Sequence, residues 1–506
     1  MPASESEAPP NTQQLTLPLD DFASRAPGPG IARQARVFCN RNLKMAGISW
    51  VGFDMDYTLA IYDQPAMDDL SIRATIKKLV ARGYPDFIQT IPVSTQFPVR
   101  GLLIDKRFGH VLKMDRYKHV HKGYHGFREL TKEELRALYH SKKIRPATPR
   151  YHWIDTLYAL SEVATYAALV DAMEKKGYAV DYARLFTDIR ECIDEAHRDG
   201  TILDEVASNL PHFVHRDLNL APTLHKLRSA GKKLFLLTNS RWAYTDKMMT
   251  YLLGGAMSEY PTWKNFFDVV IVAATKPIFF TERRPLLERE GETVKPATSP
   301  LERGKIYEGG NLQDLERALG VTGDEILYVG DHIYGDILRS KKESAWRTAM
   351  IMQELETEIA AYESCQDDFH TIEALDEQRE HLEDDLRYYQ ARIKEITRNL
   401  EHKSTNGTSN AELEADRMRF KRAVERIRGK LRQIDAELNA LERRIDLRFH
   451  PYWGSLLKEG TEQSSFGKQV DDYACLYTSK VSNLLSYSPQ QTYRSPRDVM
   501  AHEIGM

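Results

Sequence analysis

Cysteine is scarce in this sequence. Among 506 residues there are only four cysteines, and they are far apart and form no C-x-x-C pair: Cys39, Cys192, Cys365 and Cys475. A disulfide framework or a structural zinc site needs cysteines in clusters or pairs, so we expect neither. A reducing compartment is the simplest setting for such a chain, and we predict a cytoplasmic protein.

Export signals, membrane spans and a strong net charge are also lacking. Residues 1–35 begin without the basic start and apolar run of a signal peptide and are rich in Pro, Ser, Glu and Gln, which predicts a disordered tail. The most apolar long stretch, residues 157–173, carries Glu162 and Asp171 and is too polar to cross a bilayer. The net charge of -3 argues against a nucleic-acid or membrane-surface binder, so local groups must attract any anionic substrate.

What the sequence does contain is a series of short apolar runs separated by helical patterns. Four runs are nearly continuous in large or β-branched residues, as strands covered on both faces are. These runs span residues 48–53, 233–237, 268–272 and 325–329. Strands that alternate with helices predict an α/β fold, here a doubly wound parallel sheet.

The spacing of the runs predicts a large insertion. About 180 residues separate the first run from the second, far more than a crossover helix needs. The insert contains an extended part and helical patterns at 131–140, 153–175 and 181–198. We therefore expect a discontinuous core over 36–65 and 215–370, with a cap domain over 66–214.

Residues 373–448 have a heptad pattern. Apolar residues recur at alternating spacings of four and three, from Leu382 to Leu400 and, after a polar break at 402–410, from Phe420 to Ile445. The break predicts an antiparallel helical hairpin. The hairpin is either an arm for oligomerisation or a partner, or a self-contained pair that buries its own seam, and the pattern favours neither. We expect residues 449–506 to pack back on the core.

Polar side chains follow each of the four apolar runs. In an open parallel sheet, ligands bind beyond the carboxyl ends of the strands, so these groups would meet at one point. Alone, each has an ordinary explanation, such as a surface Asp pair, a helix N-cap or a surface lysine. In chain order they are Asp54, Asp56, Thr238, Asn239, Ser240, Lys276, Asp331 and Asp336.

Together these groups suit the transfer of a phosphoryl group to a carboxylate. Asp54 suits the nucleophile, and Asp56, on the same side of an extended chain, suits the acid that protonates the leaving oxygen and later activates water. Two carboxylates repel a phosphate, so a divalent cation is required, and an all-oxygen site implies Mg²⁺. Asp331 suits a metal ligand, and Asp336 suits an acceptor that holds a metal-bound water.

The order DxDxT, Thr or Ser, Lys and GDxxxxD, each after a strand, resembles the haloacid dehalogenase (HAD) superfamily of phosphohydrolases. The segments 52–59, 237–240, 276–280 and 330–342 are in turn similar to the cytosolic purine 5′-nucleotidases that prefer IMP and GMP, as is the stretch from Phe466 to Glu503. This resemblance implies Mg²⁺-dependent hydrolysis of a purine nucleoside 5′-monophosphate through an aspartyl-phosphate. It also implies transfer of the phosphate to a second nucleoside, and a homo-oligomer.

The resemblance also implies roles by position. Asp54 would be the nucleophile and Asp56 the acid and base, with its backbone carbonyl on the metal. Asp331 would be a further metal ligand. Phosphate stabilisation would fall to Thr238 and Lys276, and the neighbours of the phosphate and sugar would be Asn239 and Ser240.

Arg190, Asp194 and His197 share one face of a predicted cap helix. An arginine donor and an aspartate acceptor match the edge of a 6-oxopurine, and the resemblance places the base here; the alternative is a surface ion pair. One departure is Leu203, which stands where animal members have a base-proximal lysine, so the base preference stays open.

A nucleotide effector site is a further implication of the resemblance. Lys342 and Arg347 fall where an effector phosphate would bind, and ordinary basic surface residues are the equal alternative.

Two other functions stay open at this point. A HAD phosphatase for another phosphomonoester, such as a sugar phosphate, would not need the base-reading face of the cap helix. A scaffold that acts through the hairpin, with the core as a relic, should have lost at least one of Asp54, Asp56, Lys276 and Asp331, and none is lost.

Overall fold

The chain is built around one long, mostly parallel sheet. The computed structural model describes residues 30–140, 144–298, 300–338, 340, 344–401 and 410–496. The spatial order is β1 (Phe38–Cys39), β20 (Leu476–Thr478), β17 (Arg347–Ile351), β16 (Ile326–Gly330), β3 (Trp50–Phe53), β11 (Lys233–Leu237), β12 (Val269–Val272), β15 (Ile306–Gly309), β13 (Leu286–Glu290) and β14 (Thr293–Pro296). In this order, neighbouring strands from β20 to β15 are parallel, and antiparallel strands form both edges.

Helices cover both faces of this sheet. On one face, α8 (Leu220–Ser229) and α9 (Trp242–Leu253) share a core with Val51 of β3. On the other face, α11 (Leu312–Leu319) shares a core with Trp50 of the same strand. Successive side chains of a strand point to opposite faces, so a continuous apolar run supplies both cores. The predicted α/β fold with a parallel sheet is confirmed.

The four predicted strands are neighbours at the centre of the sheet. β11 has the predicted bounds, whereas β3 begins two residues later and β12 and β16 one residue later than the apolar runs suggested. At Gly52 of β3 an added Cβ atom would lie 2.1 Å from the ring of Phe235 on β11. Glycine is therefore needed where this ring crosses the neighbouring strand.

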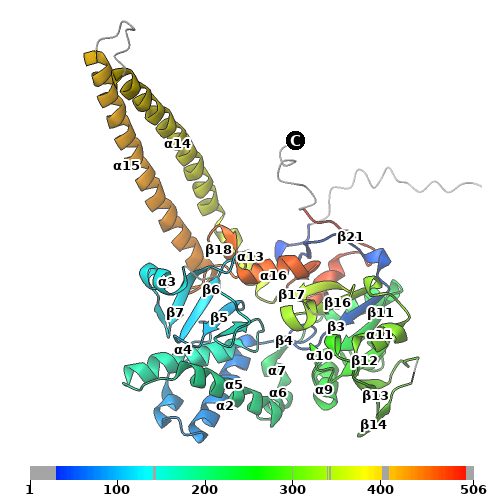
Figure 1. The fold of residues 1–506 in the computed structure, drawn as a ribbon. Helices are drawn as coiled ribbons and strands as arrows, with labels where there is room; N and C mark the ends of the chain where they lie inside the picture. The colour runs from blue at the N-terminus through cyan, green and yellow to red at the C-terminus, as the bar shows by residue number, and fades with distance from the viewer. Residues whose placement is uncertain are drawn as a thin grey trace, which may run out of the picture.

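A second sheet, antiparallel and five-stranded, lies in the insert between β3 and β11 (Figure 1). Helices α2 (Gln64–Ala81), α4 (Leu160–Lys175) and α5 (Tyr182–Arg198) pack on one another, and α3 (Lys132–Tyr139) contacts β7. The helix predicted over 153–175 is wrong at its start, because Tyr151–Ile154 pair with β5 as strand β9. The strand order is β8 (Arg128–Glu129), β7 (Val120–His125), β6 (His110–Met114), β5 (Leu102–Asp105) and β9.

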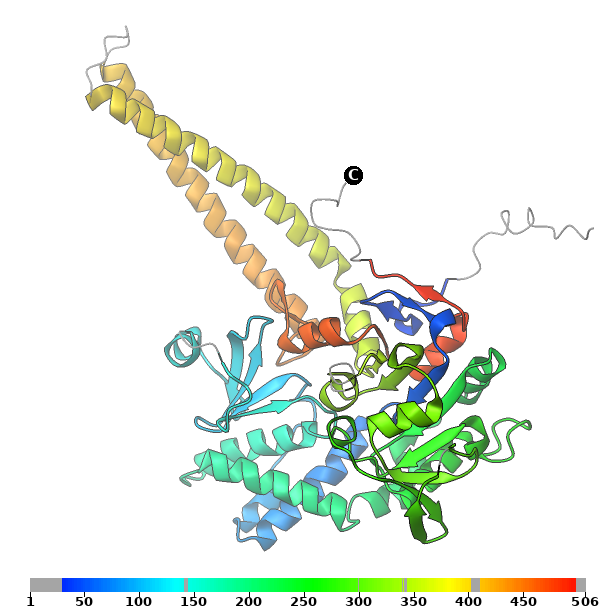
Figure 2. The same ribbon diagram turned by 45° about the vertical axis from the view of Figure 1, so that its right-hand side comes forward.

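Two long helices stand out from the body (Figures 1 and 2). These are α14 (Gln366–Glu401) and α15 (Asn410–Phe449), which we call the arm. The rings of Tyr389 and Phe420 lie 5.6 Å apart, and Arg444 pairs with Asp368 nearer the body, so the helices are antiparallel. Residues 402–409 of the predicted break lie outside the described residues. The seam between the helices buries Ile396, Val424, Ile427, Ile434, Leu438, Leu441 and Ile445.

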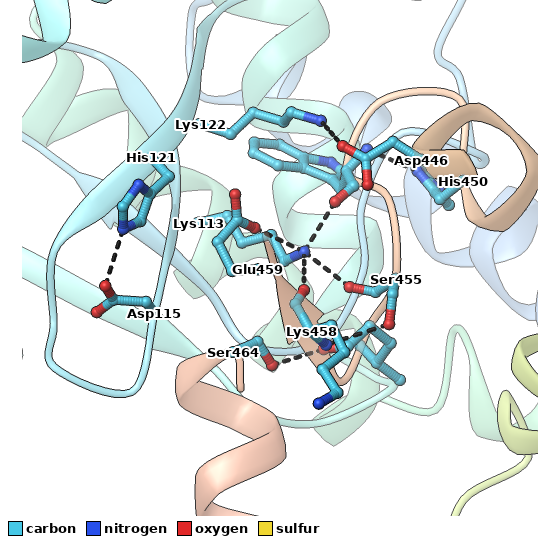
Figure 3. Close-up of polar contacts among 12 residues, drawn as sticks. Lys113, Asp115, His121, Lys122, Asp446, His450, Ser455, Lys458, Glu459 and Ser464 are labelled. Atoms are coloured by element: carbon cyan, nitrogen blue, oxygen red, sulfur yellow. Dashed lines mark hydrogen bonds and ion pairs between the residues drawn. The ribbon is translucent and has the colours of Figure 1, made fainter. Parts of the chain in front are cut away.

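The base of the arm is tied to the five-stranded sheet by a buried lysine (Figure 3). Lys113 of β6 donates to the carbonyl oxygens of Trp453, Ser455 and Lys458 at 2.8, 2.7 and 2.7 Å, and its Nζ lies 2.8 Å from Glu459. Beside it, Lys122 of β7 pairs with Asp446 of α15 at 3.0 Å. The arm and this sheet therefore form one packed unit.

The chain returns to the main sheet after the arm. α16 (Ser465–Tyr473) contacts the helical turn after β16, and β20 joins the sheet between β1 and β17. Most of the predicted tail, residues 1–29, lies outside the described residues, but residues 33–35 form a turn of 3₁₀ helix. The four cysteines are free thiols, as expected. Among the described residues, no helix has the length and apolar character needed to cross a membrane.

Candidate active site

Three aspartates meet at the carboxyl ends of the central strands. Asp54 follows β3, Asp331 follows β16, and Asp336 lies in a single turn of π-helix, Ile333–Leu338. Each side chain offers an oxygen within 4.8 Å of those of the other two, and all three are buried. The parallel pairing of β3 with β16 places these strand ends side by side. Such π-helical turns are frequent at functional sites.

Lys276 joins two of these carboxylates. Its Nζ lies 2.9 Å from Oδ1 of Asp54 and 2.7 Å from Oδ1 of Asp336, and it donates to the hydroxyl of Tyr328 at 2.8 Å. Burial lowers the pKa of Lys276, but Asp336 and Asp54 outweigh that effect and raise it. The lysine is therefore a fixed positive charge beside Asp54.

One lysine does not neutralise the cluster. Burial, opposed by Lys276 and assisted by Asp336 and Asp56, raises the pKa of Asp54 to about 8. Burial and the two neighbouring carboxylates also hold the pKa of Asp331 well above its usual range. A buried cluster of carboxyl groups that cannot all ionise beside a single lysine needs further positive charge, and carboxylate oxygens are the donors that a hard divalent cation such as Mg²⁺ prefers. The residues present therefore fit the expected metal.

Asp56 is held apart from this cluster by two hydroxyl groups. Tyr62 donates to Oδ1 and Ser240 donates to Oδ2, both at 2.6 Å. The Tyr62 hydroxyl also lies 2.8 Å from that of Tyr244. Burial raises the pKa of Asp56, while the hydrogen bonds from Ser240 and Tyr62 oppose that rise. The two carboxylates of the DxD pair thus have different surroundings.

The loop that carries Lys276 is fixed by Asn239. Its side-chain oxygen accepts from the backbone N–H of Lys276 at 2.5 Å, and its side-chain nitrogen donates to the Lys276 carbonyl at 2.9 Å. Ala273 and Thr275 in the same loop have φ of 48° and 58°, values that L-residues rarely adopt. Thr238 is buried, and its hydroxyl accepts from the Ser240 N–H at 3.1 Å. Strained backbone of this kind gathers at functional sites.

Aromatic rings connect Asp56 with the cap helix. The ring of Tyr57 lies 4.8 Å from the rings of both Tyr62 and Tyr158. Tyr158 in turn meets the edge of His197 on α5 at 5.6 Å. Burial lowers the pKa of His197, which favours the neutral ring. Of the three residues predicted to contact the base, His197 is thus the one that the rings of Tyr57 and Tyr158 connect to the strand ends.

Arg190 and Asp194 line a small hollow of about 160 Å³ on the same helix. Arg190, 42% exposed at its side chain, forms an ion pair with Glu162 of α4, with its Nε 3.4 Å from the carboxylate. Burial, opposed by Arg190 and assisted by Asp194 and Asp155, raises the pKa of Glu162 to about 7. The Asp155 carboxylate lies 4.0 Å from His332, which follows Asp331. None of the strand-end aspartates lines the hollow beside Arg190 and Asp194.

Of the two predicted effector residues, the structure describes Arg347. Lys342 lies outside the described residues. Arg347 is exposed at the first position of β17, the end of the strand opposite to the site.

Sequence reasoning missed Arg100, a fully buried arginine between the cap and the core. It forms two 2.7 Å hydrogen bonds with Glu354 and donates to the Asp331 carbonyl at 2.9 Å. Its guanidinium lies 5.1 Å from the ring centroid of Phe466. Tyr158 was also missed. Neither residue follows an apolar run or belongs to a spaced motif, so only the tertiary contacts reveal them.

The sheet order and the strand-end aspartates and lysine define a phosphatase of the HAD type. The model of the 5′ nucleotidase family matches residues 37–505, and the chain belongs to that family. It is 28% identical over 513 residues to a human 5′-nucleotidase domain-containing protein 2, covering 99% of this chain and 90% of that protein. A 5′-nucleotidase domain-containing protein of Dictyostelium discoideum is 27% identical over 475 residues, covering 92% of this chain and 74% of that protein.

Solved structures with low overall similarity include a predicted phosphatase and a dehalogenase. A predicted phosphoglycolate phosphatase from Haemophilus somnus has a TM-score of 0.27 at 14% identity and covers 60% of this chain and 86% of its own. A 2-haloacid dehalogenase from Pseudomonas syringae has a TM-score of 0.22 at 14% identity, with the same two coverages.

Proposed function

We propose that this enzyme hydrolyses purine nucleoside 5′-monophosphates, with IMP and GMP preferred, through an aspartyl-phosphate and with Mg²⁺. The observation that supports this most is the single lysine, Lys276, that bonds both Asp54 and Asp336 within a buried cluster that includes Asp331. Family membership supports the nucleotide class of substrate. Residues 66–214 act as the cap over the strand ends, and the phosphate can also pass to a nucleoside acceptor.

The first half-reaction uses the two carboxylates of the DxD pair. Asp54 attacks the phosphorus atom, and the bond between phosphorus and the 5′ oxygen breaks. Asp56 donates a proton to that leaving oxygen, a role that its raised pKa supports. Lys276 and the Thr238 hydroxyl stabilise the charge on the phosphoryl oxygens.

The second half-reaction returns the enzyme to its starting state. Asp56, now ionised, takes a proton from water, whose oxygen attacks the phosphorus of the aspartyl-phosphate. The bond between phosphorus and the Asp54 oxygen breaks and inorganic phosphate leaves. A nucleoside hydroxyl in place of the water gives phosphotransfer by the same steps. Tyr62 and Ser240 orient Asp56 throughout.

Asp54, Asp331 and the Asp56 backbone carbonyl would hold the magnesium ion, with Asp336 beside it. When bound, the ion supplies positive charge that lets a phosphate dianion approach the carboxylates. The Arg100 bond to the Asp331 carbonyl keeps this loop in place.

The cap helix supports the purine assignment. On α5, Arg190 and Asp194 offer a donor and an acceptor for the edge of a 6-oxopurine, and Tyr158, which contacts His197 of that helix, offers a ring for stacking. A sugar phosphate would use neither, which is why a general HAD phosphatase is the second candidate rather than the first. The scaffold hypothesis gains no support, because none of the four residues that a relic would lose has been lost.

Phosphate release from a panel of substrates tests the proposal. The panel is IMP, GMP, AMP, CMP, UMP, glucose 6-phosphate and p-nitrophenyl phosphate, each with Mg²⁺ and with EDTA. The Asp54→Asn variant is the blank, since it removes the nucleophile and preserves the shape of the side chain. We expect the highest kcat/KM for IMP and GMP, loss of activity with EDTA, and at least a thousand-fold loss in Asp54→Asn.

Other outcomes separate the parts of the proposal. Activity on glucose 6-phosphate alone would keep the mechanism and overturn the nucleotide substrate. Full activity in EDTA would overturn the metal requirement. Phosphate release by Asp54→Asn at the parent rate would overturn the role of Asp54.

A further inference from the structure

The arm carries a lengthwise separation of charge. Residues 366–385 of α14 contain nine Asp or Glu and one Arg, and we call them the acidic stretch. Residues 417–432 of α15 contain eight Lys or Arg and one Glu, and we call them the basic stretch. The acidic stretch begins at the body. Since Tyr389 faces Phe420, the basic stretch lies farther out, beside residues near Tyr389.

These charges are not used up within the arm. Among the described residues, the ion pairs beyond the base of the arm join residues three or four apart in the same helix, such as Arg379 with Asp376 and Arg428 with Glu425. Exposed pairs of that kind contribute little. The two stretches therefore leave an acidic surface near the body and a basic surface toward the tip.

Apolar side chains are exposed on the same helices. Tyr388 is 57% exposed and Met418 is 51% exposed in the outer part of the arm, and Leu447 is 65% exposed near its base. The seam residues are buried between the two helices, so these three side chains are not needed to hold the hairpin together. They are available for contact with another surface.

We propose that two copies of this chain associate arm against arm, in antiparallel orientation. That orientation places the basic stretch of each copy on the acidic stretch of the other, whereas a parallel pair would oppose like charges. Complementary charges beside an apolar seam set partner and orientation in paired helices. A two-fold axis perpendicular to the arm repeats the contact between basic and acidic stretches twice. The assembly is therefore complete with two copies.

The shape of the molecule permits this pairing. The arm helices have 36 and 40 residues, or about 54–60 Å at 1.5 Å per residue. The arm projects away from the body, so two antiparallel arms would hold the bodies at opposite ends (Figures 1 and 2). The contacts of Lys113 and Lys122 anchor the base of each arm (Figure 3).

Charge reversal of exposed residues in the full-length protein tests the proposal. The variant E373K/E377K/E380K reverses one face of the acidic stretch, and R419E/R422E/R426E reverses part of the basic stretch. Molar mass is measured by light scattering at 50 mM and 500 mM salt. We expect a dimer for the parent at low salt, a shift to monomer at high salt, and monomers for each variant alone.

Mixing the two variants gives the sharpest result. In a mixed antiparallel pair, the acidic stretch of one copy, now reversed to Lys, faces the basic stretch of the other copy, now reversed to Glu. The two unchanged stretches also face each other. Opposite charges therefore meet at both contacts, and a dimer should return. The control K44E/K132E/K247E reverses three exposed lysines off the arm and should stay dimeric. Nucleotidase activity serves as the test of folding.

Three results would overturn the inference. One is a parent protein that is monomeric at 50 mM salt and micromolar concentration. Another is a dimer that neither triple variant disrupts, which would place the interface elsewhere. The third is a monomer that binds an RNA or DNA oligonucleotide through Arg419, Arg422 and Arg426, which would assign the basic stretch to nucleic acid.

Discussion

Gly330 shows how a single residue without a side chain makes the site possible. It ends β16, and the Asp336 side chain folds back against it, so a Cβ atom there would lie 2.6 Å from both Cβ and Oδ2 of Asp336. Asp336 is one of the two carboxylates on Lys276, and Lys276 is in turn bonded to Asp54. The space at Gly330 therefore determines where the lysine sits relative to the proposed nucleophile.

The variant Gly330→Ala should lose activity without unfolding. The methyl group forces Asp336 away, which weakens the hold on Lys276, and a shift of about 1 Å in a catalytic group costs on the order of a hundred-fold in rate. We expect kcat for IMP to fall by that order while the circular dichroism spectrum is kept. Gly47→Ala is the matched control, because nothing lies within 4 Å of its added Cβ atom. Equal kcat in both variants would show that the contact with Asp336 is unimportant.

At the scale of elements, the central strands could be predicted and parts of the cap could not. β3, β11, β12 and β16 are buried on both faces, so their signal is a continuous apolar run that needs no partner to be recognised. β9 is only partly buried and exists because it pairs with β5, some fifty residues earlier, and such long-range pairing leaves no local pattern.

Helix α2 was missed for a different physical reason. It is buried on several sides at once, among them at Asp68, Ser71 and Thr75, so it lacks the one-sided apolar stripe that marks a surface helix. The residues of the candidate site also fall into a predictable and an unpredictable group. Residues that follow strands were predictable by position, whereas Arg100 and Tyr158 reach it only through tertiary packing.

The proposed base-reading face of α5 leads to a prediction at this scale. Arg190→Gln removes a charged donor, and hydrogen bonds to charged groups contribute about 1.5–3 kcal/mol, so KM for IMP should rise roughly ten-fold or more. Activity on p-nitrophenyl phosphate, which has no purine, should be unchanged. Arg184→Gln on the same helix is the control, because Arg184 is 78% exposed and pairs only with Asp188 among the ion pairs of the described chain. A KM for IMP that is the same in both variants would remove Arg190 from the base site.

At the scale of the whole molecule, the cap, the arm and the C-terminal segment meet at Lys113. The chain leaves the cap sheet, completes the core, runs out and back along the arm, and then surrounds this side chain with the carbonyls of residues 453, 455 and 458 (Figure 3). Glu459, 9% exposed at its side chain, supplies the opposing charge. The position of the five-stranded sheet therefore depends on residues more than three hundred positions later.

Lys113→Met tests this dependence. The variant leaves the Glu459 carboxylate and three carbonyl oxygens without their donor, and removal of one partner of a buried ion pair costs about 3–5 kcal/mol of unfolding free energy. Lys122→Met is the control, since its partner Asp446 is 46% exposed and such pairs contribute on the order of 1 kcal/mol or less. Urea unfolding should separate the two variants, and hydrogen exchange should speed up first at residues 458–463. The proposed base site lies in the cap, whereas Asp54 lies in the core. Lys113→Met should therefore change KM for IMP by a larger factor than it changes kcat for p-nitrophenyl phosphate. Equal stability of both variants would mean that the cap is held in place by its apolar contacts alone, among them the packing of Phe97 on Trp453.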